Sequence, residues 1–171
     1  LTAEQMAHDK NVLLRDYEMP HPQSAAAEII KFHCATDPTF SPPGPGVCID
    51  ESHEPESIGN IPNEAPKPDC ISPEGCLFCA KHRDIMSSEY CWKLASHSHI
   101  KSLETALYKP SQKQEIHPGY RVIDRITQKL DAISTGSQIR AMWVKDAKDS
   151  IRSGRFHPYW KGHIRLLEVF A

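Results

Sequence analysis

The sequence predicts a mainly α protein, in which short helices are followed by a long irregular loop stapled by zinc and then by a helical bundle. Two observations lead to this prediction. Eleven of the fourteen prolines fall between Pro20 and Pro73, so the chain divides into a proline-rich part and a part almost without proline. In the second part apolar residues recur at helical spacing, which indicates amphipathic helices that pack against one another. At 171 residues the chain is long enough to bury a core.

The first segment, residues 1–33, is expected to form short helices. Residues 2–17 fit one or two of them, and Ser24 is a suitable N-cap for a helix that runs to about His33. Regularity stops there, because the stretch from Cys34 to Gly75 is rich in Pro, Gly, Ser and Asp and has no sustained period. A loop of this length is uncommon inside a compact domain unless something holds it together. Residues 34–86 are therefore predicted to form a stapled module.

Closely spaced cysteines supply the staple. Cys76 and Cys79 form a Cys-x-x-Cys pair, Cys70 precedes them, and Cys48 lies upstream in a Pro-Gly-Val-Cys run. Zn²⁺ prefers four such ligands in a tetrahedron, and a site with four cysteines is closed and structural. The first choice of ligands is Cys48, Cys70, Cys76 and Cys79. Three other residues are alternatives for one position: His82, Cys34 and His33.

Other uses of the cysteines fit the sequence less well. Disulfides require an oxidising compartment, whereas the chain has no apolar run that would span a bilayer and no signal segment at its start, which indicates a soluble cytoplasmic protein. A redox role for the Cys76-Leu-Phe-Cys79 run would need alternating strands and helices around it. A metalloenzyme would need a histidine and carboxylate pair with metal-site spacing, which is not apparent. Cys91, beside Trp92 and Leu94 on an apolar helix face, is expected in the core.

Residues 87–171 are predicted to form the helical bundle. The periodicity indicates helices over residues 87–107, 118–134, 137–153 and 158–170. In the second of these, one face carries five apolar residues: Val122, Ile123, Ile126, Leu130 and Ile133.

Positive charge gathers on the third predicted helix. Residues 139–165 hold seven basic side chains against Asp146 and Asp149. Four basic residues fall within one arc of this helix and its end, roughly opposite Ile139, Trp143 and Ala147: Lys145, Lys148, Arg152 and Arg155. Such a stripe can follow a DNA backbone with salt-dependent, sequence-independent affinity. A solvated helix face is the alternative.

The pair Ala7-His8, followed nine positions later by Tyr17, resembles the last catalytic segment of the tyrosine recombinases and phage-type integrases. In that family a small residue and a histidine end a short helix, and the nucleophilic tyrosine follows on the next helix. Ala7 stands where the family usually has glycine, and Asp9 where it usually has serine or threonine. The family's arginines, lysine and further histidine precede the tyrosine helix, so the resemblance implies a C-terminal fragment of a longer enzyme.

The resemblance also implies roles for these residues. Tyr17 would form the covalent 3′-phosphotyrosyl link to DNA, and His8 would donate a hydrogen bond to a phosphoryl oxygen. Residues 1–33 would then be the end of the catalytic domain, and the fragment alone would be inactive.

The cysteine-bearing run from Pro68 to Cys79 is similar to extensions that some bacterial integrase-like proteins carry after the catalytic tyrosine. The implied partners are DNA and further protomers of the same protein in a synaptic complex, with no membrane. A non-catalytic, zinc-dependent module that binds DNA or protein is the alternative.

Overall fold

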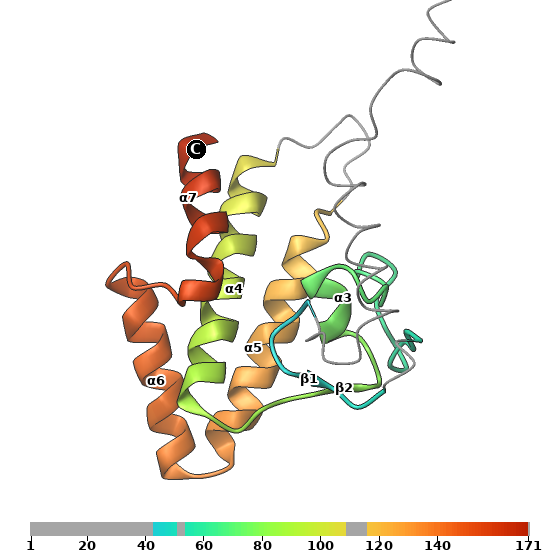
Figure 1. Ribbon diagram of the computed structural model, residues 1–171, viewed down its shortest axis with the longest axis horizontal. Coiled ribbons are helices and arrows are strands. Elements are labelled where there is room, and N and C mark those ends of the chain that lie inside the picture. The colour runs from blue at the N-terminus through green and yellow to red at the C-terminus, as the bar shows by residue number, and fades with distance from the viewer. Residues whose placement is uncertain (1–42, 51–53, 109–115, 171) are drawn as a thin grey trace, which may run out of the picture.

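The computed structural model describes residues 43–50, 54–108 and 116–170, and Figure 1 shows their arrangement. The described chain is mainly helical, as predicted. Its elements in order are β1 (Val47–Cys48), α3 (Pro73–Leu77), β2 (His82–Arg83), α4 (Ser88–Leu107), α5 (Gly119–Thr135), α6 (Gln138–Arg152), the 3₁₀ turn η3 (Pro158–Trp160) and α7 (Lys161–Phe170). The four helices expected after residue 86 are confirmed, except that the last begins with the 3₁₀ turn. The predictions for residues 1–33, with His8 and Tyr17, and for Cys34 lie outside the described residues.

Side-chain caps fix where two of the long helices begin. The hydroxyl of Ser87 accepts a hydrogen bond from the Tyr90 amide at 3.1 Å, and that of Ser137 accepts one from the Arg140 amide at 3.3 Å. Each bond satisfies one of the amides that the first turn of a helix leaves without a partner. The short connection between α5 and α6 makes them antiparallel neighbours.

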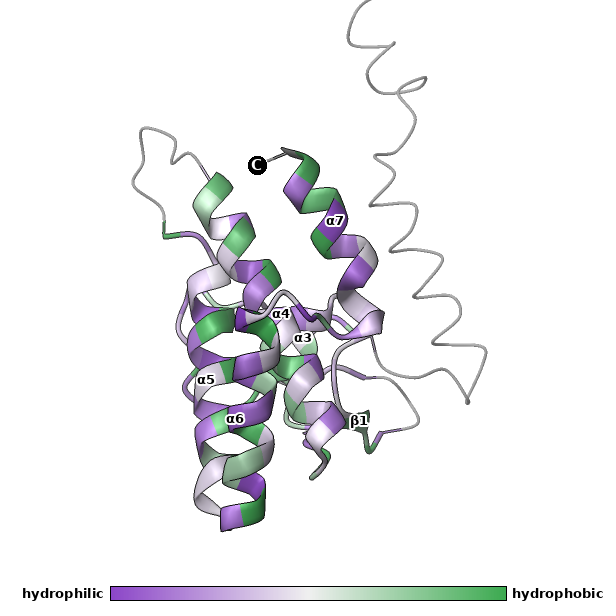
Figure 2. Ribbon diagram, turned by 90° about the vertical axis from the view of Figure 1, so that its left-hand side faces the viewer, coloured by the Kyte–Doolittle hydropathy of each residue, from purple (hydrophilic) through white to green (hydrophobic). Residues whose placement is uncertain are grey.

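The main core lies where α4, α5 and α6 meet. α4 contacts both other helices, and in Figure 1 it stands between α5 and α6. The predicted face of α5 is confirmed, because Val122, Ile126, Leu130 and Ile133 are buried, while Ile123 is only partly covered. Figure 2 shows apolar and polar residues alternating along α5 and α6, as amphipathic helices require. Cys91 is also buried in this core, as predicted.

A second, smaller core attaches α7 to the later part of α4. Ile100, Trp160 and Ile164 form it. The indole nitrogen of Trp160 donates to the Lys93 carbonyl at 2.9 Å, and the ring stacks on His97 at 4.6 Å between centroids. None of the helices in the described ranges combines the length and the apolarity that crossing a lipid bilayer requires.

The proline-rich module packs against α5 through α3. β1 and β2 pair antiparallel, with Cys48 opposite His82, and an isolated bridge joins Ser57 to Cys79. Leu77 and Phe78 from this module enter the main core, where they are nearly inaccessible to solvent. The module is therefore continuous with the helices and contributes to their core.

Candidate metal centre and nucleic-acid interface

The Cys-x-x-Cys pair lies where α3 ends. Pro73 occupies the first turn of α3, where its missing amide hydrogen costs nothing. The helix ends at Leu77, and the chain turns so that the Cys79 amide donates to the Cys76 carbonyl at 3.2 Å. The turn brings both cysteines to the same end of α3.

Cys70 enters the same region just before α3. Its φ of 57° is in the left-handed region, which is uncommon for a residue with a side chain. Asp69 holds the adjacent turn, because its carboxylate accepts from the amides of Ile71 at 3.0 Å and Ser72 at 2.9 Å. The Asp69 side chain therefore fixes the backbone conformation just before α3, where Cys70 lies.

Two glycines bring the Cys48 segment against this turn. A Cβ atom on Gly44 would lie 2.7 Å from the Cβ of Cys76, and one on Gly46, whose φ is 111°, would lie 2.4 Å from Nε2 of His82. Only glycine can pass this close to the two side chains. The strand pairing of Cys48 with His82 then places the fourth predicted cysteine beside the segment that carries Cys79.

The cysteine thiols influence one another electrostatically. Burial raises the pKa of the Cys76 thiol to about 12, and its neighbours Cys70, Cys79 and Asp69 add to the rise. A hydrogen bond from the backbone of Gly44 acts in the opposite direction. A bound metal ion would favour the thiolate much more strongly, because a thiol that coordinates a metal is deprotonated. The donor set therefore fits a zinc ion by its chemistry.

The structure does not show the tetrahedron itself. Among the residues it describes, no three Cys, His, Asp or Glu side chains are positioned to share one ion. None of the five described cysteines forms a disulfide. The zinc-stapled loop and the quartet of Cys48, Cys70, Cys76 and Cys79 stay a prediction.

The alternative ligand His82 is occupied by protein groups. Its Nε2 lies 2.5 Å from the Pro45 carbonyl oxygen, to which it donates, and its Nδ1 faces the Lys129 ammonium at 3.5 Å and the Asp84 carboxylate at 3.9 Å. Burial lowers the pKa of the imidazole, which favours the neutral ring. Both ring nitrogens of His82 therefore have protein partners, and the Cys48 thiol has one too, because it donates to the Asp50 carbonyl at 3.6 Å.

The four residues of the predicted basic stripe are all exposed. Lys145, Lys148, Arg152 and Arg155 face solvent, whereas Ala147 on the other side of α6 is buried. Trp143 is partly buried, but Ile139 at the start of the helix is 63% exposed. The stripe is therefore a real surface feature along α6 and its end.

Two carboxylates pair with the middle of the stripe. Asp131 lies 3.9 Å from the Lys148 ammonium, and Asp149 lies 3.0 Å from the Arg152 guanidinium. Exposed pairs of this kind contribute about 0.2–1 kcal/mol, so a phosphate can displace them. Lys148 and Arg152 also border a recess of about 270 Å³ between α4, α5 and α6, together with the hydroxyl residues Ser98, Ser102 and Thr127.

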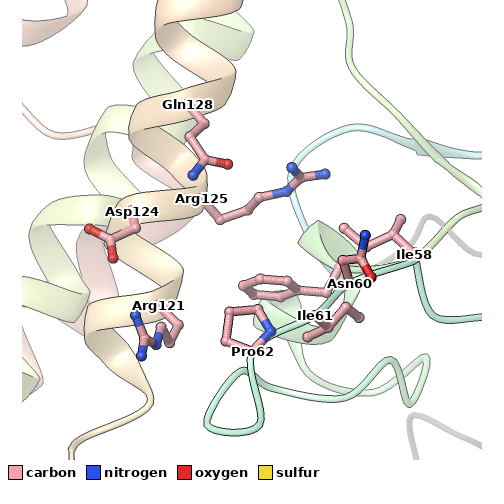
Figure 3. Close-up of a pocket in the computed structure, with 9 residues that line it drawn as sticks. Ile58, Asn60, Ile61, Pro62, Arg121, Asp124, Arg125 and Gln128 are labelled. Atoms are coloured by element: carbon pink, nitrogen blue, oxygen red, sulfur yellow. The ribbon is translucent and has the colours of Figure 1, made fainter.

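A recess between α5 and the segment Ile58–Pro62 was not anticipated from the sequence (Figure 3). Its volume is about 220 Å³, and Arg121 and Arg125, one turn apart on α5, border it. The Arg125 guanidinium donates to the Leu77 carbonyl at 3.1 Å, and Arg121 pairs with Glu64 at 3.1 Å. The spacing of the two arginines was the available signal. Their partners belong to the proline-rich module, so the pair serves to join that module to α5.

No known protein family, curated protein or solved structure matches this chain.

Proposed function

We propose that this chain is the C-terminal part of a tyrosine recombinase or phage-type integrase, and that residues 43–170 form a zinc-stabilised helical module that contacts the DNA backbone. The observation that carries the DNA contact is the exposure of the whole basic stripe on one side of α6, while the opposite side is buried against α4 and α5. The spacing of His8 and Tyr17 supports the recombinase assignment.

The zinc part of the proposal assigns Cys48, Cys70, Cys76 and Cys79 as ligands. Cys70 precedes α3, Cys76 lies within it, Cys79 follows it, and Cys48 pairs with His82 in the adjacent two-stranded sheet. A shared ion would hold a proline-rich stretch that has little regular structure of its own. Because metal affinity becomes folding free energy in such a site, the proposal predicts that the module loses structure when zinc is removed.

Elemental analysis and a thiol titration test this assignment. The purified chain should contain one zinc with four protected thiols, and Cys76→Ser should lose the metal. Cys91→Ala is the matched control, because Cys91 is buried in the main core and is not one of the predicted zinc ligands. Unchanged circular dichroism in a strong chelator, or metal that persists in Cys76→Ser, contradicts a structural zinc held by these cysteines.

DNA binding at several salt concentrations tests the stripe. Each phosphate contact contributes about 0.9 to the slope of log affinity against log salt, so Lys148→Ala combined with Arg152→Ala should lower the slope by about 1.8. Lys67→Ala removes an exposed cation from the proline-rich module and should leave the slope unchanged. An unaltered slope in the double variant would mean that the stripe is a solvated helix face that does not contact DNA.

The catalytic part of the proposal is tested at Tyr17. In a protein that also carries the arginine-bearing site found before the tyrosine in the family, Tyr17→Phe should abolish covalent DNA adducts without affecting folding, because it removes only the nucleophilic oxygen. His8→Ala should slow adduct formation without preventing it. Adducts that persist in Tyr17→Phe contradict the assignment.

A non-catalytic module that needs zinc and binds DNA or protein is the second candidate. It is favoured by the two hydrophobic cores that residues between Ile58 and Leu167 form with one another, as a module with its own fold requires. Under this alternative Tyr17→Phe is without effect, whereas the zinc and salt experiments give the same results as before. The tyrosine variant therefore separates the two proposals.

A further inference from the structure

A recess lies at the end of α6, where the basic stripe ends. Its volume is about 400 Å³, within the range of about 300–1,000 Å³ that small-molecule sites occupy. α4, the end of α6, the turn that follows and the start of α7 contribute its lining: Trp92, Ser150, Gly154, Arg155, Phe156 and Lys161.

The two aromatic rings of this recess are fixed in place. The indole nitrogen of Trp92 donates to the Arg155 carbonyl at 3.0 Å, and its ring meets His157 edge-on at 5.1 Å. Phe156 stacks on His99, with 4.7 Å between centroids and 17° between the ring planes. Both rings are only partly buried, so each can offer aromatic surface to a planar ligand without rearrangement.

The charge of the lining is entirely positive. Arg155 and Lys161 are exposed, and no carboxylate lines the recess. Within the described ranges neither cation forms an ion pair, in contrast to Lys148 and Arg152 on the same stripe. A guanidinium nitrogen of Arg155 lies 3.4 Å from the Ser150 hydroxyl, which orients it along the wall. The recess therefore combines aromatic surface with two cations that no carboxylate of the described residues neutralises.

We propose that this recess binds one unpaired nucleotide of a DNA strand that follows the basic stripe. The base lies against Trp92 and Phe156, and its flanking phosphates lie near Arg155 and Lys161. Stacking on aromatic side chains beside a positive groove is how proteins hold single-stranded nucleic acid. A peptide of acidic residues alone would use the cations but would offer no aromatic ring to stack on Trp92 and Phe156. The inference rests on the proposed contact of the stripe with DNA.

Binding of three DNA duplexes to the full 171-residue chain tests this inference. The first is fully paired, the second has one unpaired adenine, and the third has an abasic site in place of that adenine. We expect about tenfold tighter binding of the second duplex, because one stacked base is worth roughly this factor or more. The abasic duplex should bind like the paired one, since it offers no base to the rings.

Two variant pairs localise the effect. Phe156→Leu keeps a large apolar side chain but removes the aromatic face, and it should abolish the preference for the unpaired adenine while paired binding stays unchanged. Tyr120→Leu, at an exposed aromatic on α5, is its control. Lys161→Gln should weaken binding of the unpaired-base duplex, whereas Arg165→Gln, at an exposed cation outside the lining, should not. Thermal melting shows whether each variant is folded.

The outcomes distinguish this inference from the proposed function. Equal affinity for all three duplexes, with binding still dependent on salt, overturns the nucleotide site and leaves the stripe intact. A preference that survives both Phe156→Leu and Trp92→Leu also overturns it. Absence of any DNA binding overturns both proposals. Displacement of the unpaired-base duplex by polyglutamate as readily as by a single-stranded oligonucleotide would make the recess a general anion site.

Discussion

The ion pair between Asp84 and Lys129 joins the proline-rich module to α5, and its removal should measure how strongly that junction stabilises the fold. The Lys129 ammonium donates to the two carboxylate oxygens at 2.8 and 3.1 Å, and the Tyr90 hydroxyl donates to the same carboxylate. The side chains of Lys129 and Asp84 are 10% and 25% exposed. Lys129→Met removes the charge and keeps an unbranched apolar stem to cover the site.

The magnitude follows from this burial. Breaking a fully buried ion pair costs about 3–5 kcal/mol, because one charge is left without its partner. A quarter of the Asp84 side chain is in water, and Tyr90 still donates to it, so the loss should be closer to that of a hydrogen bond to a charged group. We expect Lys129→Met to lower the free energy of unfolding by about 1.5–3 kcal/mol. Asp84→Asn should have an effect of similar size.

Urea denaturation of the wild type, both single variants and the double variant gives the coupling between the two residues. The double variant should lose less than the sum of the single losses, by about 1–2 kcal/mol, because the pair can be broken only once. Additive losses within about 0.5 kcal/mol would refute the idea that this pair joins the module to α5.

The same coupling should depend on pH. Burial alone would raise the pKa of the Asp84 carboxyl, but the hydrogen bonds from Lys129 and Tyr90 lower it overall. A folded pKa below the unfolded value of about 3.9 means that the stabilisation is complete above that value and is lost as pH falls through the folded pKa. The cycle measured at pH 7 and again below about pH 4 should therefore show a smaller coupling in acid, and a larger one would contradict the assignment of charge.

Substitutions at three further positions have distinct expected effects. Gly44→Ala should destabilise the module, since its Cβ would lie 2.7 Å from that of Cys76; a melting temperature equal to that of the wild type would contradict the close approach. Ser87→Ala removes the cap that accepts from the Tyr90 amide and should cost about 0.5–2 kcal/mol in urea denaturation, whereas Ser87→Asp should cost little. Ile164→Ala should lower the free energy of unfolding by about 2–5 kcal/mol, because it leaves a cavity in the smaller core. Hydrogen exchange should become faster mainly in α7 and at the end of α4, whereas uniform acceleration would show that the two cores unfold as one cooperative unit.

Much of the helical architecture was predictable from local patterns. The apolar spacing of Val122, Ile126 and Leu130 identified both the helix and its buried face, and each of these residues is buried in the core. Such a pattern can be recognised in the sequence because a helix places every third or fourth residue on one side, whichever element the helix packs against. The basic stripe on α6 was predictable for the same reason, as a set of positions on one face.

The recesses were not predictable in this way. Trp92 and Phe156 lie far apart in the sequence, and they border the same cavity only because α7 and η3 fold back on α4. In the sequence, nothing distinguishes Arg125 from any other charged residue of α5, whereas in the structure its guanidinium donates a hydrogen bond to the Leu77 carbonyl. Periodicity indicates that a residue lies on a given face, but it does not indicate what stands opposite that face.

The sequence by itself determined that the chain is mainly helical and where its last four helices lie, because these depend on residues close together along the chain. Only the tertiary structure decided that the segment of Cys48 lies beside the end of α3, through the close passage of Gly44 and Gly46. It also decided that the His82 ring is engaged by Pro45. These depend on contacts between distant segments, whose geometry is fixed by packing and has no local signature in the sequence.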